Sequence, residues 1–430
     1  QREATFMVRR VKSKLLVIPD VYRGRDYLQL ASLIRSEAAE LNHIVVLGKA
    51  PAEAAFTAFP DLESAAAMPL PEVSPGSLVH IGFTSGTTGE PKGVMNTHQT
   101  LDAVLFRFIG HHGTELLNDS LVNLIASPMG HHTGFLWGVL FTTLLQGRGV
   151  YLEHWDREVA ARIIQREGVT WMPGAPTFLQ DLLQVPGMGP GSLKMYAMAG
   201  SPIPRSLPRE ASAALDAFIC PAWGMTEWGI GICGSLRLPR DRVDVTDGVA
   251  IEGCEARIMA EPEREAAPGE EGDLQIRGGG LFLGYFDRPD FTADAFVDGW
   301  FQTGDRAIKW DDGFISLSGR SKDIIIRGGE NVPVVEIETL IYEHPDVLDV
   351  AVVGYPDERL GERACAVLVC RSGGSLDLPT LVDFLLSQGM SKHFLPERIE
   401  RLQTLPKTMS GKIKKAELRQ WLIDGGEPPS

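Results

Sequence analysis

The chain has 430 residues, of which 44% are hydrophobic and 23% are charged, and this composition excludes a disordered or collagen-like chain. Its formal net charge is −15, and such an acidic protein lacks the basic stripe that nucleic-acid binding requires. The five cysteines are scattered and form no CxxC pair, which favours a reducing compartment.

Neither a membrane segment nor a secretory signal is predicted. The longest apolar run, residues 134–145, contains two threonines and is too short to span a bilayer. The first residues lack the charged-then-apolar order of a signal peptide. A cytoplasmic location is therefore expected.

The first part of the chain alternates short apolar runs with helical patterns. In chain order we predict a strand at 14–19, a helix at 27–41, strands at 43–48 and 122–126, a helix at 133–145 and a strand at 149–152. Strands that alternate with helices form a parallel sheet covered by helices. The sequence therefore predicts parallel α/β subdomains in this part of the chain.

From about residue 250 the pattern changes to short alternating strands between Gly and Asp turns, such as those at 272–277 and 313–317. This pattern favours a small β-rich subdomain. A last unit follows the charged stretch at Gly319 and Arg320. Its predicted strands lie at 347–353 and 364–369, and its predicted helices at 334–342, 378–388 and 415–423. The predicted domains are 1–319 and 320–430.

Residues 84–93 form the segment most typical of a binding site, with four hydroxyl side chains, three glycines and a lysine. Glycines let backbone N–H groups converge on an anion, while hydroxyls and an ammonium add donors. The alternative is an ordinary polar turn, and the segment lacks the Gly-Lys-Ser/Thr ending of a Walker A loop. The candidate phosphate ligands are Thr84, Ser85, Gly86, Thr87, Thr88, Gly89 and Lys92.

Six segments resemble, in the same order, the motifs of the AMP-forming acyl-CoA synthetase, peptide-synthetase adenylation and luciferase superfamily. They are residues 84–93, 199–204, 223–227, 302–305, 319–323 and 406–412. One such motif is a weak signal, whereas six in order identify the chain as a member. The resemblance implies an acyl-CoA synthetase-like α/β fold, with a large N-terminal domain and a small, mobile α+β C-terminal domain.

The resemblance also implies roles for single residues. Lys412 is the expected catalytic lysine, and Lys322 is the expected hinge of the domain rotation. The other expected roles are ribose binding by Asp305 and Arg320, phosphate binding by Thr226, Mg²⁺ binding by Glu227, adenine binding by Gly200, Ser201, Pro202, Trp223, Gly224 and Met225, an acyl pocket at His131, His132 and Gly134, and a CoA channel at Gly328 and Gly329.

These roles suit the chemistry of the side chains, although each has an ordinary alternative. One carboxylate can accept both ribose hydroxyls, but Asp305 can equally be a turn residue. Glu227 offers the hard oxygen that Mg²⁺ prefers, or it is a solvated acid. Trp223 can stack on adenine or pack in the core. The Lys412 ammonium can bridge a carboxylate and the α-phosphate as charge builds in the transition state, or it belongs to a solvated basic run.

Three other patterns are not favoured. Residues 229–234 match GxGxxG but follow no clear strand, so they do not predict a dinucleotide site. The histidine doublets at 111–112 and 131–132 lack the HExxH spacing and a carboxylate partner. No GxSxG segment supports a serine hydrolase.

The implied reaction uses Mg²⁺, ATP and CoA in two half-steps, through an acyl-AMP intermediate. The segments expected to line the acyl pocket are mostly small, apolar or aromatic. No Asp stands beside His131 and His132 to hold an amino group. The expected substrate is an apolar monocarboxylate, medium-chain or alicyclic, and the nearest resemblance is to cyclohexanecarboxylate–CoA and medium-chain fatty-acid–CoA ligases.

Two alternatives stay open: an adenylation domain that loads a separate carrier protein, and a truncated fragment that binds nucleotide without turnover. The second arises because only 83 residues precede the phosphate loop, fewer than in the family, so the N-terminus is expected to be truncated. The expected partners include no nucleic acid and no membrane. The resemblance leaves open a homodimer and the identity of the acyl chain.

Overall fold

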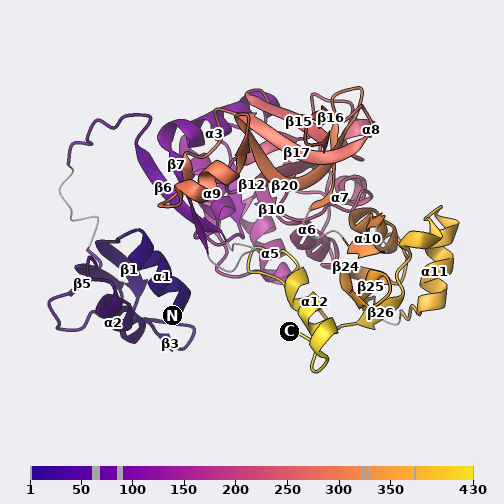
Figure 1. Cartoon of the computed structure of the whole chain (residues 1–430). Coiled ribbons are helices and arrows are strands. Elements are labelled where there is room, and N and C mark those ends of the chain that lie inside the picture. The colour runs from indigo at the N-terminus through magenta and orange to yellow at the C-terminus, as the bar shows by residue number, and fades with distance from the viewer. Residues whose placement is uncertain are drawn as a thin grey trace. The chain divides into compact units, whose positions relative to one another are not determined.

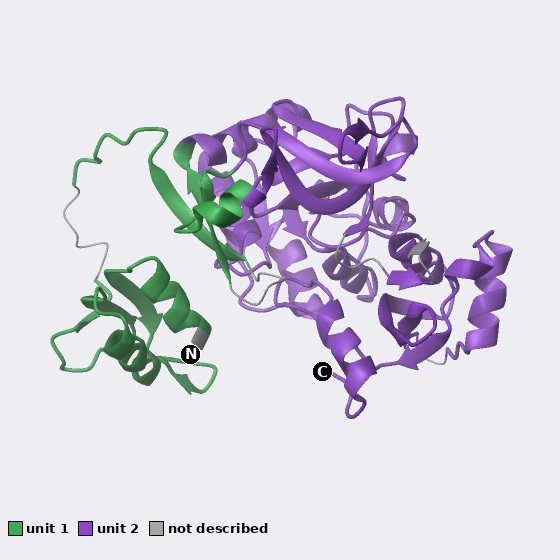
Figure 2. Ribbon diagram, in the orientation of Figure 1, with its two compact units in different colours: residues 1–98, 282–293 green, residues 99–281, 294–430 purple. Residues whose placement is uncertain are grey.

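The structure is a computed structural model that describes residues 2–60, 68–84, 91–320, 325–327, 330–371 and 374–429. Its Cα positions divide the chain into two compact units, residues 1–98 with 282–293 and residues 99–281 with 294–430 (Figure 2). Within the described part, no helix is long and apolar enough to cross a membrane.

The first unit holds a small parallel sheet and a small antiparallel sheet. The parallel sheet has the order β1-β4-β5, and the antiparallel sheet has the order β18-β7-β6. Asp26 begins the second helix by accepting hydrogen bonds from the backbone N–H groups of Leu28 and Gln29. The predicted strand, helix and strand at 14–48 are confirmed, although the helix ends at Glu37. The elements are α1 (Arg2–Arg10), β1 (Leu15–Pro19), β2 (Val21–Tyr22), β3 (Arg25–Asp26), α2 (Tyr27–Glu37), β4 (His43–Leu47), β5 (Phe56–Ala58), β6 (Leu78–Thr84), β7 (Lys92–Thr97), β18 (Gly284–Tyr285) and α9 (Pro289–Asp294).

A seven-stranded sheet with the order β14-β13-β12-β11-β10-β8-β9 forms the centre of the second unit. Strands β9, β8, β10, β11 and β12 run parallel, whereas β13 and β14 are antiparallel to their neighbours. The strands are β8 (Val122–Ile125), β9 (Arg148–Tyr151), β10 (Trp171–Gly174), β11 (Met195–Met198), β12 (Phe218–Met225), β13 (Gly229–Cys233) and β14 (Val249–Ala250). The predicted strands at 122–126 and 149–152 are thus confirmed.

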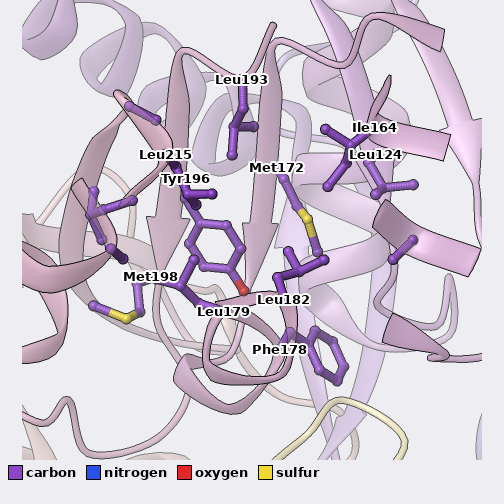
Figure 3. Close-up of a cluster of buried hydrophobic side chains, with 14 of the residues drawn as sticks. Leu124, Ile164, Met172, Phe178, Leu179, Leu182, Leu193, Tyr196, Met198 and Leu215 are labelled. Atoms are coloured by element: carbon purple, nitrogen blue, oxygen red, sulfur yellow. The ribbon is translucent and has the colours of Figure 1, made fainter. Parts of the chain in front are cut away.

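Helices cover both faces of this sheet. Met172 and Tyr196 point into a buried cluster with Leu179 and Leu182 (Figure 3). On the other face, Trp171 packs against Trp137 and Phe141. Successive residues of a strand point to opposite faces of the sheet. Because helices bury both faces, both sets of side chains are mostly apolar. The helices of the first face are α5 (Arg157–Glu167), α6 (Pro176–Leu183) and α7 (Leu207–Leu215), and those of the second are α3 (His98–His112), η1 (Thr133–Leu140) and α4 (Phe141–Leu144).

The helix predicted at 133–145 is mostly a π-helix, which is a correction to the expectation of regular helix. In η1 the backbone N–H of Phe141 donates to the carbonyl of Leu136, five residues earlier. Gly134 and Gly138 lower the preference for an α-helix. A Cβ at Gly134 would overlap the carbonyl of Pro128. The wide π-helical turns and the missing side chain of Gly134 therefore let η1 lie against the chain that follows β8.

The β-rich subdomain and the C-terminal region complete the second unit (Figure 1). The β-rich sheet has the order β16-β15-β17-β20-β19, with β21 paired to β20. Its elements are α8 (Arg240–Val243), β15 (Cys254–Glu261), β16 (Arg264–Glu265), β17 (Glu271–Gly278), β19 (Phe296–Val297), β20 (Trp300–Lys309) and β21 (Ile315–Arg320). The strand predicted at 313–317 begins later, because Gly313 has φ +84° and belongs to the turn.

The C-terminal region has its own sheet, of order β23-β22-β25-β24 with β26 parallel to β25, and its own buried core. Its elements are β22 (Ile325–Arg327), β23 (Glu330–Val332), α10 (Val334–Tyr342), β24 (Val347–Asp357), β25 (Gly361–Cys370), α11 (Leu378–Ser387), η2 (Lys392–Phe394), β26 (Arg398–Arg401) and α12 (Lys415–Asp424). All predicted elements of this region are present. The α/β fold class is therefore confirmed, whereas the domain boundary at 319/320 stays a prediction, because residues 321–324 lie outside the described residues.

Candidate active site

The two ends of the predicted phosphate loop belong to an antiparallel hairpin of the first unit. Thr84, the last residue of β6, lies opposite Lys92, the first residue of β7. The Lys92 ammonium lies 4.8 Å from the ring centre of Tyr285 and 4.6 Å from that of Phe291, so two aromatic faces hold its charge. The remaining predicted phosphate ligands, Ser85, Gly86, Thr87, Thr88 and Gly89, lie outside the described residues.

In the second unit, the predicted acyl-pocket and adenine-binding residues follow the carboxyl ends of parallel strands. The chain leaving β8 leads to His131 and His132, and the chain leaving β11 leads to Gly200. Strand β12 ends in the predicted adenine-binding segment. Ligands of α/β sheets bind outside the carboxyl ends of the strands. The fold thus brings motifs separated by up to about a hundred residues to one edge of the sheet.

A β-bulge shapes the end of β12. The register between β12 and β13 shifts after Trp223, so that Gly224 pairs with Ile230, and such bulges re-aim side chains. A Cβ at Gly224 would overlap the carbonyl oxygen of Gly229. Only glycine therefore fits at this position. The predicted Ser201, Met225 and Thr226 are half-buried, and the predicted Gly200 and Pro202 are exposed.

Asp305 is the best-anchored residue of the site, with only 5% of its surface exposed. Its Oδ2 accepts a hydrogen bond of 2.8 Å from Trp223 Nε1, and its Oδ1 accepts one of 2.9 Å from Arg320 Nε. Thr303 Oγ1 accepts from its backbone N–H at 3.0 Å. A carboxylate has about four lone-pair sites, so Asp305 retains capacity for further donors. The sequence predicted Asp305, Trp223 and Arg320 separately, and the structure joins them.

Glu227 is buried just beyond β12, next to the half-buried Thr226. No group of three potential metal ligands that includes Glu227 is found among the described residues. A single carboxylate nevertheless fits Mg²⁺, because this ion keeps several waters and is commonly held by one or two carboxylates together with substrate phosphates. The Glu227 carboxylate therefore suits a Mg²⁺ ion that binds together with the phosphates of a nucleotide.

The predicted acyl-pocket residues lie at the start of the π-helix η1: His131 and His132 precede it, and Gly134 is its second residue. His131 Nδ1 accepts a hydrogen bond of 3.2 Å from the backbone N–H of Thr133. The protein atoms around the His131 ring lower its pKa, and the nearby positive charge of Lys412 lowers it further. The lowered pKa favours the neutral imidazole, whose Nδ1 accepts this hydrogen bond. His132 and Gly134 are buried.

Lys412 is exposed and sits on a tight turn that is tied to α6. The Lys412 N–H donates to Thr408 Oγ1 at 3.1 Å, and Lys407 bridges to Ile413 across the turn. Thr177 Oγ1, which is buried in the first turn of α6, donates to the carbonyl of Gly411 at 2.9 Å. The structure thus places the Lys412 backbone next to the carboxyl end of β10, and the Lys412 charge close to His131.

Further contacts along α6 hold the same C-terminal region. Burial raises the pKa of Asp181, which lies near the charges of Lys407 and Asp349. Burial also raises the pKa of Tyr342 to about 12, and Gln180 hydrogen-bonds its side chain. Residues 177, 180 and 181 lie on adjacent turns of one helix face. No sequence motif marks Thr177 or Gln180, so the role of α6 in holding the C-terminal region could not be predicted.

Three further predicted residues lie outside the described part of the chain. They are the hinge residue Lys322 and the CoA-channel residues Gly328 and Gly329. The GxGxxG match at 229–234 is largely strand β13, whereas a dinucleotide site needs these glycines in the turn before a helix.

Comparisons with known proteins agree with this arrangement. Two family models match the chain, "AMP-binding enzyme" over residues 1–286 and "AMP-binding enzyme C-terminal domain" over residues 336–412. The chain is 32% identical to a medium-chain fatty-acid–CoA ligase of Escherichia coli, over 98% of this chain and 75% of that protein. It is 31% identical to a 2,3-dihydroxybenzoate–AMP ligase of Bacillus subtilis, over 97% of this chain and 77% of that protein.

Solved structures show the same fold. The ATP-bound crystal structure of MatB from Rhodopseudomonas palustris matches with a TM-score of 0.85 and 26% identity, over 98% of this chain and 82% of that one. An anthranilate–CoA ligase in complex with anthranoyl-AMP matches with a TM-score of 0.86 and 23% identity, over 98% of this chain and 80% of that one.

Proposed function

The chain belongs to the AMP-binding enzyme family as an AMP-forming acyl-CoA synthetase, and on this premise we propose that it joins an apolar monocarboxylate to CoA. The proposed acid is medium-chain or alicyclic, such as cyclohexanecarboxylate. The likeness to a medium-chain fatty-acid–CoA ligase supports this acid class, as does the apolar composition of the segments around η1 and β10.

In the first half-step, an oxygen of the substrate carboxylate attacks the α-phosphorus of ATP. The bond between the α-phosphorus and the bridging oxygen breaks, and pyrophosphate leaves. Negative charge grows on the α-phosphate oxygens, and the Lys412 ammonium stabilises it. The hydrogen bond between Thr177 Oγ1 and the Gly411 carbonyl carries this proposal, because it fixes the lysine-bearing turn at the carboxyl edge of the parallel sheet.

Residues of the second unit orient the nucleotide. Asp305 accepts hydrogen bonds from the ribose hydroxyls, and Arg320 adds donors beside it. The faces of Trp223 and the backbone of residues 200–202 hold the adenine. Glu227 would hold Mg²⁺, and Thr226 would donate to a phosphate oxygen. The bound Mg²⁺ would neutralise phosphate charge. Thr84, Lys92 and the loop between them bind the phosphates.

In the second half-step, the CoA thiolate attacks the acyl carbon and AMP leaves with the former carboxylate oxygen. The C-terminal domain turns on Lys322 and withdraws Lys412, so that Gly328 and Gly329 line the thiol's path. A rotation between the steps keeps the acyl-adenylate from water while the acceptor site forms. The side-chain hydrogen bonds from Thr177 and Gln180 to this region support a reversible docking.

Product analysis tests the proposal. The protein is incubated with Mg·ATP, CoA and monocarboxylates from acetate to decanoate, together with benzoate and cyclohexanecarboxylate. AMP, pyrophosphate and an acyl-CoA are expected with a medium-chain or alicyclic acid. ADP and phosphate would contradict adenylate formation, and turnover restricted to aromatic acids would contradict the acid class. AMP release that depends on a carrier protein and not on CoA would favour the carrier protein as the acyl acceptor. One relative is a fatty acid–[acyl-carrier-protein] ligase.

A further inference from the structure

A histidine and two cysteines meet in the core of the second unit, away from the residues assigned above. His112 is the last residue of α3, Cys220 lies on β12, and Cys233 lies on the neighbouring strand β13. Their exposed fractions are 3%, 0% and 0%. Ile219 joins the cluster with Tyr196 on one face of the sheet, so its neighbour Cys220 points to the opposite face, where α3 ends.

The ligand atoms of the three side chains converge. His112 Nε2 lies 3.9 Å from Cys220 Sγ and 3.8 Å from Cys233 Sγ, and all three atoms lie within 4.8 Å of one another. A metal bound at about 2.3 Å to sulfur and about 2.0 Å to nitrogen, at angles of about 120°, separates sulfur from nitrogen by about 3.7 Å. Both nitrogen–sulfur distances therefore already match those of a trigonal metal site.

The surroundings give this group few other partners. His112 packs between the rings of Phe108 and Phe218, at centroid distances of 4.4 and 6.2 Å. Its Nδ1 is buried without a hydrogen-bond partner, so contacts with the two sulfurs are the only polar interactions found for this ring in the described part of the chain. Without a metal, the Cys220 thiol donates to the Gly234 carbonyl at 3.4 Å. A bound metal ion would displace this proton and accept the lone pairs of the three atoms that face one another here.

The charge of the group suits a monovalent ion. Cu(I) bound by one thiolate, one thiol and one neutral imidazole forms a group with no net charge, so it leaves no uncompensated charge in the core.

We propose that His112, Cys220 and Cys233 form a three-coordinate site for Cu(I). Thiolate ligands select Cu(I) or Zn²⁺ among biological metals. A structural Zn²⁺ site is almost always four-coordinate, and the described residues supply three ligands to this group. The sequence pattern did not favour a metal at the doublet of His111 and His112, because the two cysteines stand 108 and 121 residues after His112.

Competition for Cu(I) tests the proposal on the full chain. The protein is titrated with Cu(I) under anaerobic, reducing conditions in the presence of bicinchoninate, a coloured Cu(I) chelator. The wild type is expected to withhold one equivalent, and Cys220→Ser and Cys233→Ser are expected to lose this retention. Cys365→Ser, a matched control at a cysteine that is equally buried in β25, should retain it. Equal retention by all variants, or no retention by the wild type, would overturn the proposal.

X-ray absorption at the copper edge gives a result that needs no variant. Copper-loaded wild type should show two sulfur neighbours and one nitrogen neighbour in three-coordinate geometry. Coordination by nitrogen and oxygen alone would place the ion elsewhere and contradict the site.

The chelator competition is repeated with Zn²⁺ and a zinc chelator, and no stoichiometric retention of Zn²⁺ is expected. Retention of Zn²⁺ in preference to Cu(I) would also overturn the proposal.

Discussion

The surroundings of Asp305 and those of Lys412 differ in how the fold holds a functional group. Asp305 lies in a sheet, buried, with hydrogen bonds from Trp223 and Arg320 to its two oxygens. Lys412 lies on an exposed turn, and α6 holds that turn through one buried hydroxyl. Rigid anchoring suits a group that binds the same ligand throughout a reaction, because it keeps the binding geometry fixed. A weak attachment suits a group that is needed in one half-step only, because a few kcal/mol can release it.

The largest expected effect comes from Lys412→Ala. Loss of one preorganised positive group should slow adenylate formation by about 10²- to 10³-fold, measured as carboxylate-dependent pyrophosphate release. Thioester formation from supplied acyl-AMP should persist. Lys414→Ala serves as the matched control, because Lys414 is a neighbouring lysine paired only with Glu417 among the described ion pairs. Equal loss in both half-reactions would show that Lys412 is not specific to the first.

Asp305→Asn should have the next largest effect, on nucleotide affinity. The amide keeps an acceptor for Trp223 but loses the charge, and hydrogen bonds to a charged group contribute about 1.5–3 kcal/mol. We expect ATP to bind about 10- to 100-fold more weakly by isothermal titration. Asp312→Asn is the control, since that exposed acid pairs with Arg242 on the β-rich subdomain. Unchanged ATP affinity would remove Asp305 from the nucleotide site.

Thr177→Val tests the tether of the lysine-bearing turn. The substitution keeps the shape and removes the donor to Gly411, a hydrogen bond that contributes about 0.5–1.5 kcal/mol. Adenylate formation should slow roughly 2- to 10-fold, while the thioester half-step should be unchanged or faster. Thr170→Val removes a hydroxyl that accepts from Val122 N–H at the opposite end of the sheet. If both variants slowed both half-steps alike, the Thr177 hydroxyl would be merely structural.

The smallest effect concerns His131. The Lys412 ammonium is the second cause, after the protein surroundings, of its lowered pKa. Replacing Lys412 with Gln removes a positive charge that disfavours the imidazolium, so the pKa of His131 should rise. Titration of ¹³C-labelled histidine by NMR measures this shift, with His393 as an internal reference in the C-terminal region. An unchanged His131 pKa would mean that Lys412 does not approach this ring in solution.

Much of the fold could be predicted from the sequence, because apolar runs and helical periods mark buried strands and helices locally. The helix at 334–342 was predicted to the residue. The π-helix could not be predicted, since hydrophobic period does not distinguish five-residue from four-residue hydrogen bonding. In the site, motif order predicted Asp305 and Trp223 but not their hydrogen bond, which joins residues 82 positions apart. The contacts of Thr177 and of the group of His112, Cys220 and Cys233 could not be predicted for the same reason, because tertiary structure brings these partners together.

The π-helix η1 makes the number of residues in this segment matter as much as their identity. Leu136, Trp137 and Phe141 anchor its far side in the core, and one deleted residue would restore ordinary four-residue spacing. Because each residue turns a helix by about 100°, the preceding histidines would then face a different direction. A single-codon deletion or insertion here would therefore redirect His131 and the buried His132 while the anchoring side chains of the far side keep their places. Length variation in this segment would thus reshape the proposed acyl pocket in a way that substitutions cannot.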